Sequence, residues 1–204
     1  MYRAVLDACV LVPSLQRDFL LQLATQEAFS PLWGSGILTE LDYTLANLHA
    51  RRGVRDSEAR RRHLLTQMKH VFPGSEVNAP KNRAYDYGLN DADDAHVAHA
   101  ALIGKADAIV TDDKRAGFKT AVMLIEANVE IIFANQFAAN TVAAHPEAGV
   151  QALVVMSQRR ANPPQTPEQI LDLLVARHGM DEVGDILRPL QAELQRTATT
   201  PMLE

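Results

Sequence analysis

Acidic side chains stand at several places in this 204-residue sequence where carboxylates could act together. They are Asp7, the group Asp91, Asp93 and Asp94, and the pair Asp112–Asp113. Carboxylates gathered at one point repel one another unless a cation lies between them, and Mg²⁺ or Mn²⁺ is the usual cation. The pattern therefore raises the hypothesis of a divalent metal site.

Two of these positions follow strand-like segments. Residues 2–6 (YRAVL) and 108–111 (AIVT) are short apolar runs that favour strands, and they are followed by Asp7 and by Asp112–Asp113. Ligands of open parallel sheets bind outside the carboxyl ends of the strands, so these acids can share one crevice. The helix predicted from about residue 91 leads into the second strand, which brings its aspartates near the same edge.

Each acid also has an ordinary structural interpretation. Aspartates at a helix start commonly cap the helix, and Asn90 or Asp91 can do so here. Acids after a strand frequently form turns. Glu40 would ordinarily be a solvated residue of its helix, but it lies one turn from Ile37 and beside Leu41, at the border of an apolar stripe. The set of acids, rather than any single member, supports the metal-site hypothesis.

The elements that must position these residues form an α/β fold with a central, mainly parallel sheet flanked by helices. Strands are predicted at residues 2–6, 108–111 and 130–133, with at most a short strand in the polar segment 76–90. Helices are predicted at about 14–24, 36–52, 57–71, 90–106 and 121–127. Pro31 and Gly34 predict a loop between the first two helices.

Strand signals end near Gln136, which predicts an all-helical C-terminal extension. We expect one domain over residues 1–137 and a helical subdomain over residues 138–204. Residues 166–169 (TPEQ) form a capping box with Pro at the first helical position, and Gly179 ends that helix. Pro189 is expected to kink or end the last helix.

Composition restricts the class of protein. The chain is 47% hydrophobic and 22% charged, which is typical of a folded globular protein, and no apolar stretch is long enough to span a bilayer. The N-terminus does not resemble a signal peptide, and the single cysteine, Cys9, fits a reducing cytoplasm. We expect Cys9 to be a small buried strand residue rather than a nucleophile. The net charge of −5 does not exclude a nucleic-acid partner, because an acidic site lowers the total without preventing a basic face elsewhere.

Four segments together resemble a known family. LDACVLVP near the start, ILTEL, DADDAHVAHAA and IVTDDKRAGF have the order and spacing of PIN domains. The resemblance covers roughly residues 1–137 and is closest to the VapC-type toxins of bacterial toxin–antitoxin systems. It implies a catalytic set of Asp7, Glu40, Asp94 and Asp113, with Asp112 as the alternative to Asp113. The helical tail is similar to the extension found on a subset of these toxins.

The resemblance also implies an activity, a cofactor and partners. It implies hydrolysis of RNA phosphodiester bonds with Mg²⁺ or Mn²⁺ held by Asp7, Asp94 and Asp113, while Glu40 completes the ligand shell or orients the water. Transfer RNA and ribosomal RNA are both compatible substrates. A cognate antitoxin protein is expected, a homodimer is compatible, and the expected location is the cytoplasm.

Cationic and aromatic residues complete the set of candidates. Lys114 and Arg115 follow the acidic pair directly, so they are predicted to bind RNA. The run of arginines between residues 51 and 62 fits an RNA groove, a solvated face or an antitoxin-binding face equally well. His96 and His99 fall on different helix faces, which disfavours a joint zinc site, and Trp33 is expected to pack in the core.

Three other classes are less consistent with the sequence. A haloacid-dehalogenase-type Mg²⁺-dependent phosphatase would carry a second aspartate at position 9, where this chain has Cys9. A receiver-like signalling domain would need a strand-end lysine that has no counterpart here. A non-catalytic PIN-like module that binds RNA or protein remains the alternative, and retention of all four acids disfavours it.

Overall fold

The computed structural model describes the backbone of residues 1–199 and the side chains up to residue 192. In chain order the elements are β1 (Arg3–Leu6), α1 (Ala8–Leu11), α2 (Ser14–Thr25), β2 (Ser30–Gly34), α3 (Ser35–Arg51), α4 (Ser57–Val71), β3 (Glu76–Val77), η1 (Ala92–Asp94), α5 (Ala95–Gly104), β4 (Ala108–Val110), η2 (Phe118–Thr120), α6 (Val122–Glu126), β5 (Glu130–Ile132), α7 (Ala134–Ala144), α8 (Pro146–Arg159), α9 (Pro167–His178) and α10 (Asp181–Thr199). The last five residues of the predicted helical subdomain lie outside the described residues.

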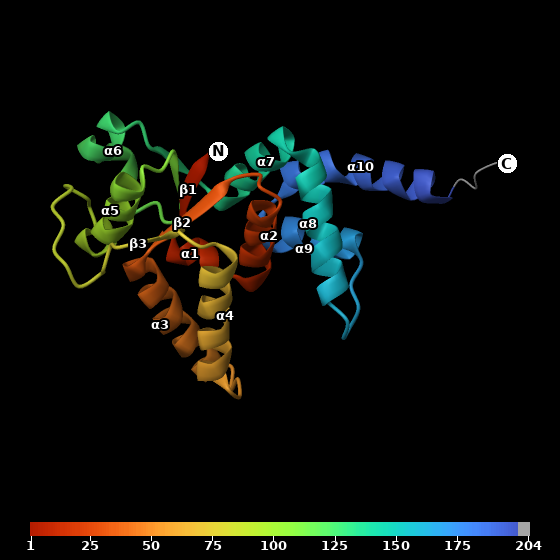
Figure 1. Ribbon diagram of the computed structural model, residues 1–204, viewed down its shortest axis with the longest axis horizontal. Coiled ribbons are helices and arrows are strands. Elements are labelled where there is room, and N and C mark those ends of the chain that lie inside the picture. Colours follow the sequence, from red (N-terminus) through yellow and green to blue (C-terminus); the bar gives the residue numbers. More distant parts are fainter. Residues whose placement is uncertain (200–204) are drawn as a thin grey trace. The chain divides into compact units, whose positions relative to one another are not determined.

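The five strands form one parallel sheet in the order β3-β2-β1-β4-β5, of which Figure 1 labels β1, β2 and β3. β1 is central, and its residues Ala4, Val5 and Leu6 pair with β4 and have no exposed surface. Strands that are buried on both faces are apolar without alternation, which is the pattern that residues 4–6 show. The prediction of an α/β fold with a mainly parallel sheet is confirmed, and the carboxyl ends of β1 and β4 lie side by side.

The loop predicted around Pro31 is wrong, because these residues form β2. Pro31 pairs with Ala4 of β1, and the neighbouring Ser30 N–H donates to the carbonyl of Tyr2, just before β1. The nitrogen of Pro31, which carries no hydrogen, points toward the β3 side of the strand. Because β3 pairs only with Trp33 and Gly34, the sheet loses no hydrogen bond at Pro31. Trp33 is fully buried, as predicted, and its burial stabilises the strand.

The starts of α3 and α5 meet near the carboxyl end of the sheet. α5 packs against β1, β2 and β4, and α3 packs along α4 (Figure 1). A Cβ atom at Gly36 in α3 would lie 2.6 Å from His96 Cδ2 and 2.8 Å from the carbonyl oxygen of Ala79. Only glycine allows this approach, which brings α3, α5 and the loop after β3 together.

Contacts divide the chain into two compact units, residues 1–17 with 29–134 and residues 18–28 with 135–204. The predicted boundary at residue 137 falls inside α7, and the grouping of part of α2 with the C-terminal helices has no signal in the sequence. Among the described helices, none combines the length and apolar character that crossing a membrane requires.

In the second unit, α8, α9 and α10 pack on one another around Leu153, Leu171 and Leu187, which have no exposed surface. The capping box at the start of α9 is present with both hydrogen bonds, and α9 ends at Gly179 with φ of +59°, as predicted. α10 continues through Pro189, so the prediction that this proline could end the helix is wrong.

Candidate active site

Asp7 is a buried carboxylate at the junction of β1 and α1. Its Oδ1 accepts a hydrogen bond of 2.6 Å from the N–H of Ala8 and thereby caps α1, while its Oδ2 accepts one of 2.7 Å from Thr111 Oγ1. Burial raises the pKa of Asp7, and the negative charge of Glu40 adds to this, although the hydrogen bonds oppose it. Because Asp7 is only 6% exposed, its ionised side chain would be stabilised by a nearby cation.

Asp94 lies at the end of η1 and the start of α5. Burial, together with the negative charges of Asp7, Asp91, Glu40 and Asp113, raises the pKa of Asp94 to about 7. The other three acids implied by the family resemblance, Asp7, Glu40 and Asp113, therefore all act electrostatically on Asp94. The four acids come from the end of β1, from α3, from η1 and from the segment after β4.

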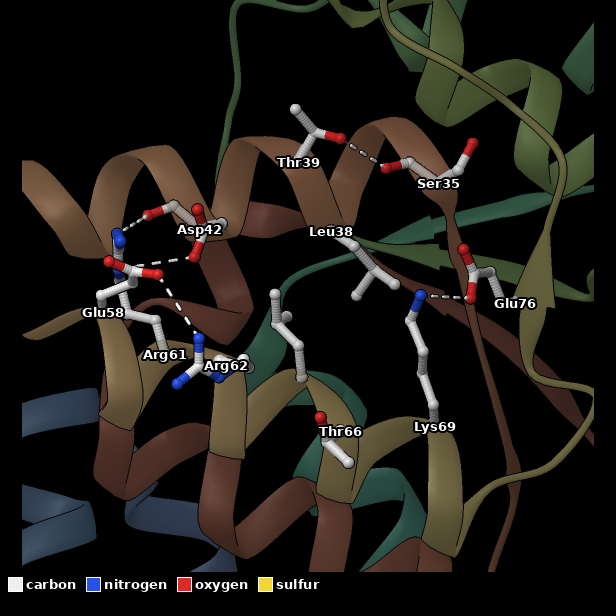
Figure 2. A pocket seen from close by; sticks show the side chains of 11 residues that line it. Ser35, Leu38, Thr39, Asp42, Glu58, Arg61, Arg62, Thr66, Lys69 and Glu76 are labelled. Atoms are coloured by element: carbon white, nitrogen blue, oxygen red, sulfur yellow. Dashed lines mark hydrogen bonds and ion pairs between the residues drawn. The ribbon is translucent and has the colours of Figure 1, made fainter.

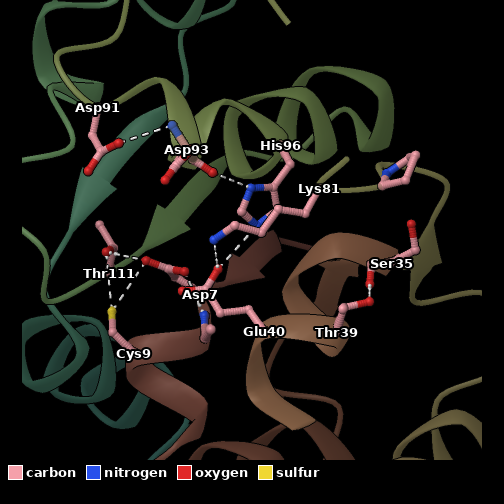
Figure 3. A network of polar contacts seen from close by, with 12 residues as sticks. Asp7, Cys9, Ser35, Thr39, Glu40, Lys81, Asp91, Asp93, His96 and Thr111 are labelled. Carbon is pink, nitrogen blue, oxygen red and sulfur yellow. Dashed lines mark hydrogen bonds and ion pairs between the residues drawn. The ribbon is translucent and has the colours of Figure 1, made fainter. Parts of the chain in front are cut away.

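The other acids at the start of this helix have a structural role. Asp91 Oδ1 accepts a hydrogen bond of 3.0 Å from the N–H of Asp93 and caps η1, as predicted (Figure 3). The side chain of Asp93 is exposed. Within the sequence DADDA, the capping function therefore falls on Asp91, whereas Asp94 interacts electrostatically with the other candidate acids.

Glu40 is held by two residues that the sequence did not single out for this role. Its Oε2 lies 2.9 Å from Lys81 Nζ and 3.6 Å from His96 Nε2 (Figure 3). Lys81 belongs to the loop after β3, and the negative charges of Glu40, Asp94 and Asp93 outweigh its burial and raise its pKa. No motif marks Lys81, because its partner lies 41 residues away in sequence.

His96 is a buried residue, 1% exposed, rather than a surface histidine. Its Nδ1 donates a hydrogen bond of 2.8 Å to the carbonyl of Asp93, so its Nε2 faces Glu40 without a hydrogen-bond partner. Burial lowers the pKa of His96. His99 has different partners: it stacks on Tyr85 at 4.2 Å between ring centroids, and its Nδ1 lies 2.7 Å from the hydroxyl of Tyr87.

Asp112 and Asp113 diverge after β4. Asp112 Oδ1 accepts a hydrogen bond of 3.1 Å from the N–H of Ala134 at the start of α7, whereas the charge of Asp113 acts on Asp94. Thr111 Oγ1 accepts a hydrogen bond of 3.1 Å from the N–H of Asp113 while it donates to Asp7. One hydroxyl therefore binds both the side chain of Asp7 and the backbone of Asp113.

Cys9 is not the buried strand residue that the sequence predicts, since it is exposed and lies in α1. Its Sγ is 3.3 Å from Asp7 Oδ2 and 3.4 Å from Thr111 Oγ1. Loss of hydration around the thiol and the charge of Asp7 raise the pKa of Cys9 to about 12. The thiol therefore stays protonated near neutral pH, which argues against a nucleophilic role.

The cations divide into paired and unpaired groups. In the groove of about 580 Å³ between α3 and α4, Arg61 pairs with Asp42 at 3.4 Å, Arg62 with Glu58 at 3.4 Å and Lys69 with Glu76 at 2.9 Å (Figure 2). Arg115 is 92% exposed, with its Nε 3.8 Å from Asp113 Oδ1. Lys114 Nζ lies over the ring of Phe133 at 5.1 Å.

The donor set fits a hard divalent cation. The four carboxylates offer oxygen atoms only, which is what Mg²⁺ and Mn²⁺ prefer, and their mutual repulsion is relieved by positive charge. Within the residues that the structure describes, no group of three or more acidic, histidine or cysteine side chains is arranged so that it could hold a metal ion as it stands. Metal binding would therefore require the acids to move closer together, with water or substrate completing the coordination.

Comparison with known proteins agrees with this arrangement. A family model described as PIN domain matches residues 3–115, and one described as VapC50 C-terminal domain matches residues 134–189. No curated protein and no solved structure matches the chain. The first match covers more than half of the sequence. The chain therefore belongs to the PIN-domain family, as a VapC-type toxin with a C-terminal extension.

Proposed function

We propose that this protein is a ribonuclease that depends on Mg²⁺ or Mn²⁺ and acts as the toxin of a bacterial toxin–antitoxin pair. Membership of the PIN and VapC families supports the nuclease class. The observation that carries the proposal is the convergence of Asp7, Glu40 and Asp113 on Asp94, whose pKa is raised to about 7. Perturbed carboxylates in a shared crevice are typical of catalytic sites.

Asp7, Asp94 and Asp113 would hold the metal. When bound, the ion lowers the pKa of a water molecule and offsets the charge of the attacked phosphate. Thr111 keeps Asp7 and Asp113 in register by hydrogen bonds to both. No covalent protein nucleophile takes part, in accordance with the raised pKa of Cys9.

Glu40 would orient the attacking water. Lys81 fixes its Oε2 at 2.9 Å, and the buried His96 limits its movement on the other side. Lys114 and Arg115 would bind the RNA backbone beside the acids, because Lys114 lies over the Phe133 ring without an ion pair and Arg115 is 92% exposed next to Asp113.

The proposal is tested by cleavage of labelled RNA with purified protein. We expect activity with Mg²⁺ or Mn²⁺, loss of activity in EDTA, and loss of at least a hundredfold in kcat for Asp94→Asn, because the metal loses a charged ligand. Asp93→Asn, one residue earlier on η1 with an exposed side chain, is the matched control and should keep its activity. Cleavage that persists in EDTA or in Asp94→Asn contradicts the proposal.

The proposed partners follow from the toxin class. An antitoxin would block the acidic crevice, the substrate would be transfer RNA or ribosomal RNA in the cytoplasm, and two copies could associate as a homodimer. Sequencing of RNA ends after brief induction identifies the substrate. Random fragmentation of all RNA would contradict a dedicated target.

A further inference from the structure

A pocket of about 460 Å³ opens beside the acidic crevice. It lies between the ends of β4 and β5 and the η2 turn, and all of its lining residues belong to the first compact unit. Its walls include Asn90, Asp113, Lys114, Phe118, Lys119 and Phe133. Because Asp113 belongs to both, the pocket continues directly from the acids.

The pocket combines an aromatic ring with two ammonium groups. Lys114 Nζ and Lys119 Nζ lie 5.1 Å and 5.4 Å from the centre of the Phe133 ring. Throughout the part of the chain with described side chains, no carboxylate lies within ion-pair distance of either ammonium. The lysines at positions 69 and 81, in contrast, each pair with a glutamate at 2.9 Å.

Unpaired ammonium groups that lie over an aromatic ring leave the pocket with an excess of positive charge. The attraction of each ammonium to the ring is modest, so a phosphate can draw either lysine away from it. An exposed ring face then becomes available for stacking, and base–aromatic stacking beside phosphate-binding lysines is the usual chemistry of single-stranded RNA sites.

We propose that this pocket is a nucleotide subsite for the RNA strand next to the cleaved bond. Phe133 stacks on the base, and Lys114 and Lys119 bind the phosphates that flank it. The proposal rests on the proposed ribonuclease function, and it adds a site of base recognition that lies outside the acids. A nucleotide held here places the adjoining phosphate at Asp113, because the pocket and the acids share this residue.

The first experiment tests stacking with chemically altered RNA. Short RNA substrates carry a single abasic ribonucleotide on one side or the other of the cleaved bond, and kcat/KM is measured for wild type, Phe133→Leu and Phe133→Tyr. In wild type we expect one abasic position to lower kcat/KM about tenfold. In Phe133→Leu the same change should have little further effect, whereas Phe133→Tyr, which keeps a ring, should behave as wild type does.

The second experiment measures binding of the same unaltered RNA in EDTA by fluorescence anisotropy. Lys119→Gln should weaken binding several-fold and lower the dependence of log K on log salt by about one. Lys105→Gln is the matched control, because Lys105 follows α5 and precedes β4, at the opposite ends of the strands. It removes the same charge and should leave binding near that of wild type.

Two results overturn the subsite. One is an abasic effect of equal size in wild type and Phe133→Leu, and the other is equal binding by Lys119→Gln and Lys105→Gln. If circular dichroism shows that Phe133→Leu does not fold, Phe133→Tyr and the lysine variants still test the subsite. If the variants show no subsite but cleavage is retained, the subsite is rejected and the nuclease proposal stands. If RNA binding depends on Lys119 but no RNA is cleaved, the nuclease proposal is rejected and the pocket is an RNA-binding site only.

Discussion

Replacement of Asp94 by asparagine should make the metal-free protein more stable at pH 8. The pKa of Asp94 is raised in the folded protein from 3.8 to about 7, so the folded state binds the proton more tightly than the unfolded state does. The stability that this proton contributes is therefore present below pH 3.8 and is lost as the pH rises to 7. Asparagine is neutral in both states and does not suffer this loss.

The size of the gain follows from the two pKa values. The interval from 3.8 to about 7, at 1.36 kcal/mol per pH unit, corresponds to about 4 kcal/mol, and solvent screening of a partly exposed carboxylate reduces this to about 2 kcal/mol. For a chain of this length the gain corresponds to an increase in Tm of about 4–8 °C at pH 8. At pH 5 the gain should be less than half as large.

The assay is thermal unfolding in EDTA at pH 5, 6, 7 and 8, with Asp93→Asn as the control that changes an exposed neighbour. Saturating Mg²⁺ should then raise the Tm of wild type more than that of Asp94→Asn, because the metal binds the folded acids. A variant that is no more stable than wild type at pH 8, or a difference that does not change with pH, refutes the reasoning.

Three further substitutions test the packing and hydrogen bonds around the site and in the second unit. Thr111→Val keeps the shape of the side chain but removes the hydrogen bond to Asp7 Oδ2. It should lower the free energy of unfolding in urea by about 1–3 kcal/mol and should also lower kcat. Unchanged values of both would contradict the role of this hydroxyl. Gly36→Ala places a methyl group 2.6 Å from His96 Cδ2 and should lower the free energy of unfolding by about 1–3 kcal/mol. An unchanged Tm would show that the neighbouring residues move apart without loss of stability. Leu174→Ala, at a position in α9 with no exposed surface, should cost about 2–5 kcal/mol in urea unfolding, whereas a loss below 1 kcal/mol would mean that this core is loosely packed.

The sequence predicted the parts of the site that depend on local patterns. Asp7 and Asp113 follow apolar runs that are recognisable as buried strands, and parallel pairing of β1 with β4 then places both at one edge. The match to a PIN domain over residues 3–115 agrees with the four segments that carried the resemblance. These features need no knowledge of distant contacts.

Other features depend on contacts that no local pattern marks. β2 contains a proline and ends in glycine, and both residues are typical of turns. The segment is nevertheless a strand, because Trp33 is buried and Pro31 has no hydrogen-bonding partner strand on the side where its N–H is missing. Lys81 lies in a polar loop without periodicity, and its importance comes only from contact with Glu40. Tertiary packing decides both cases.

The hydrogen bond between Thr111 and Asp7 joins residues that are 104 positions apart. The crevice therefore cannot form on the ribosome until β4 has emerged and paired with β1. At usual rates of synthesis, the interval between translation of Asp7 and of Asp113 is about 5–20 s, during which the growing polypeptide lacks a complete set of acids. The order of the strands along the chain therefore sets how long the growing polypeptide lacks its complete acidic site.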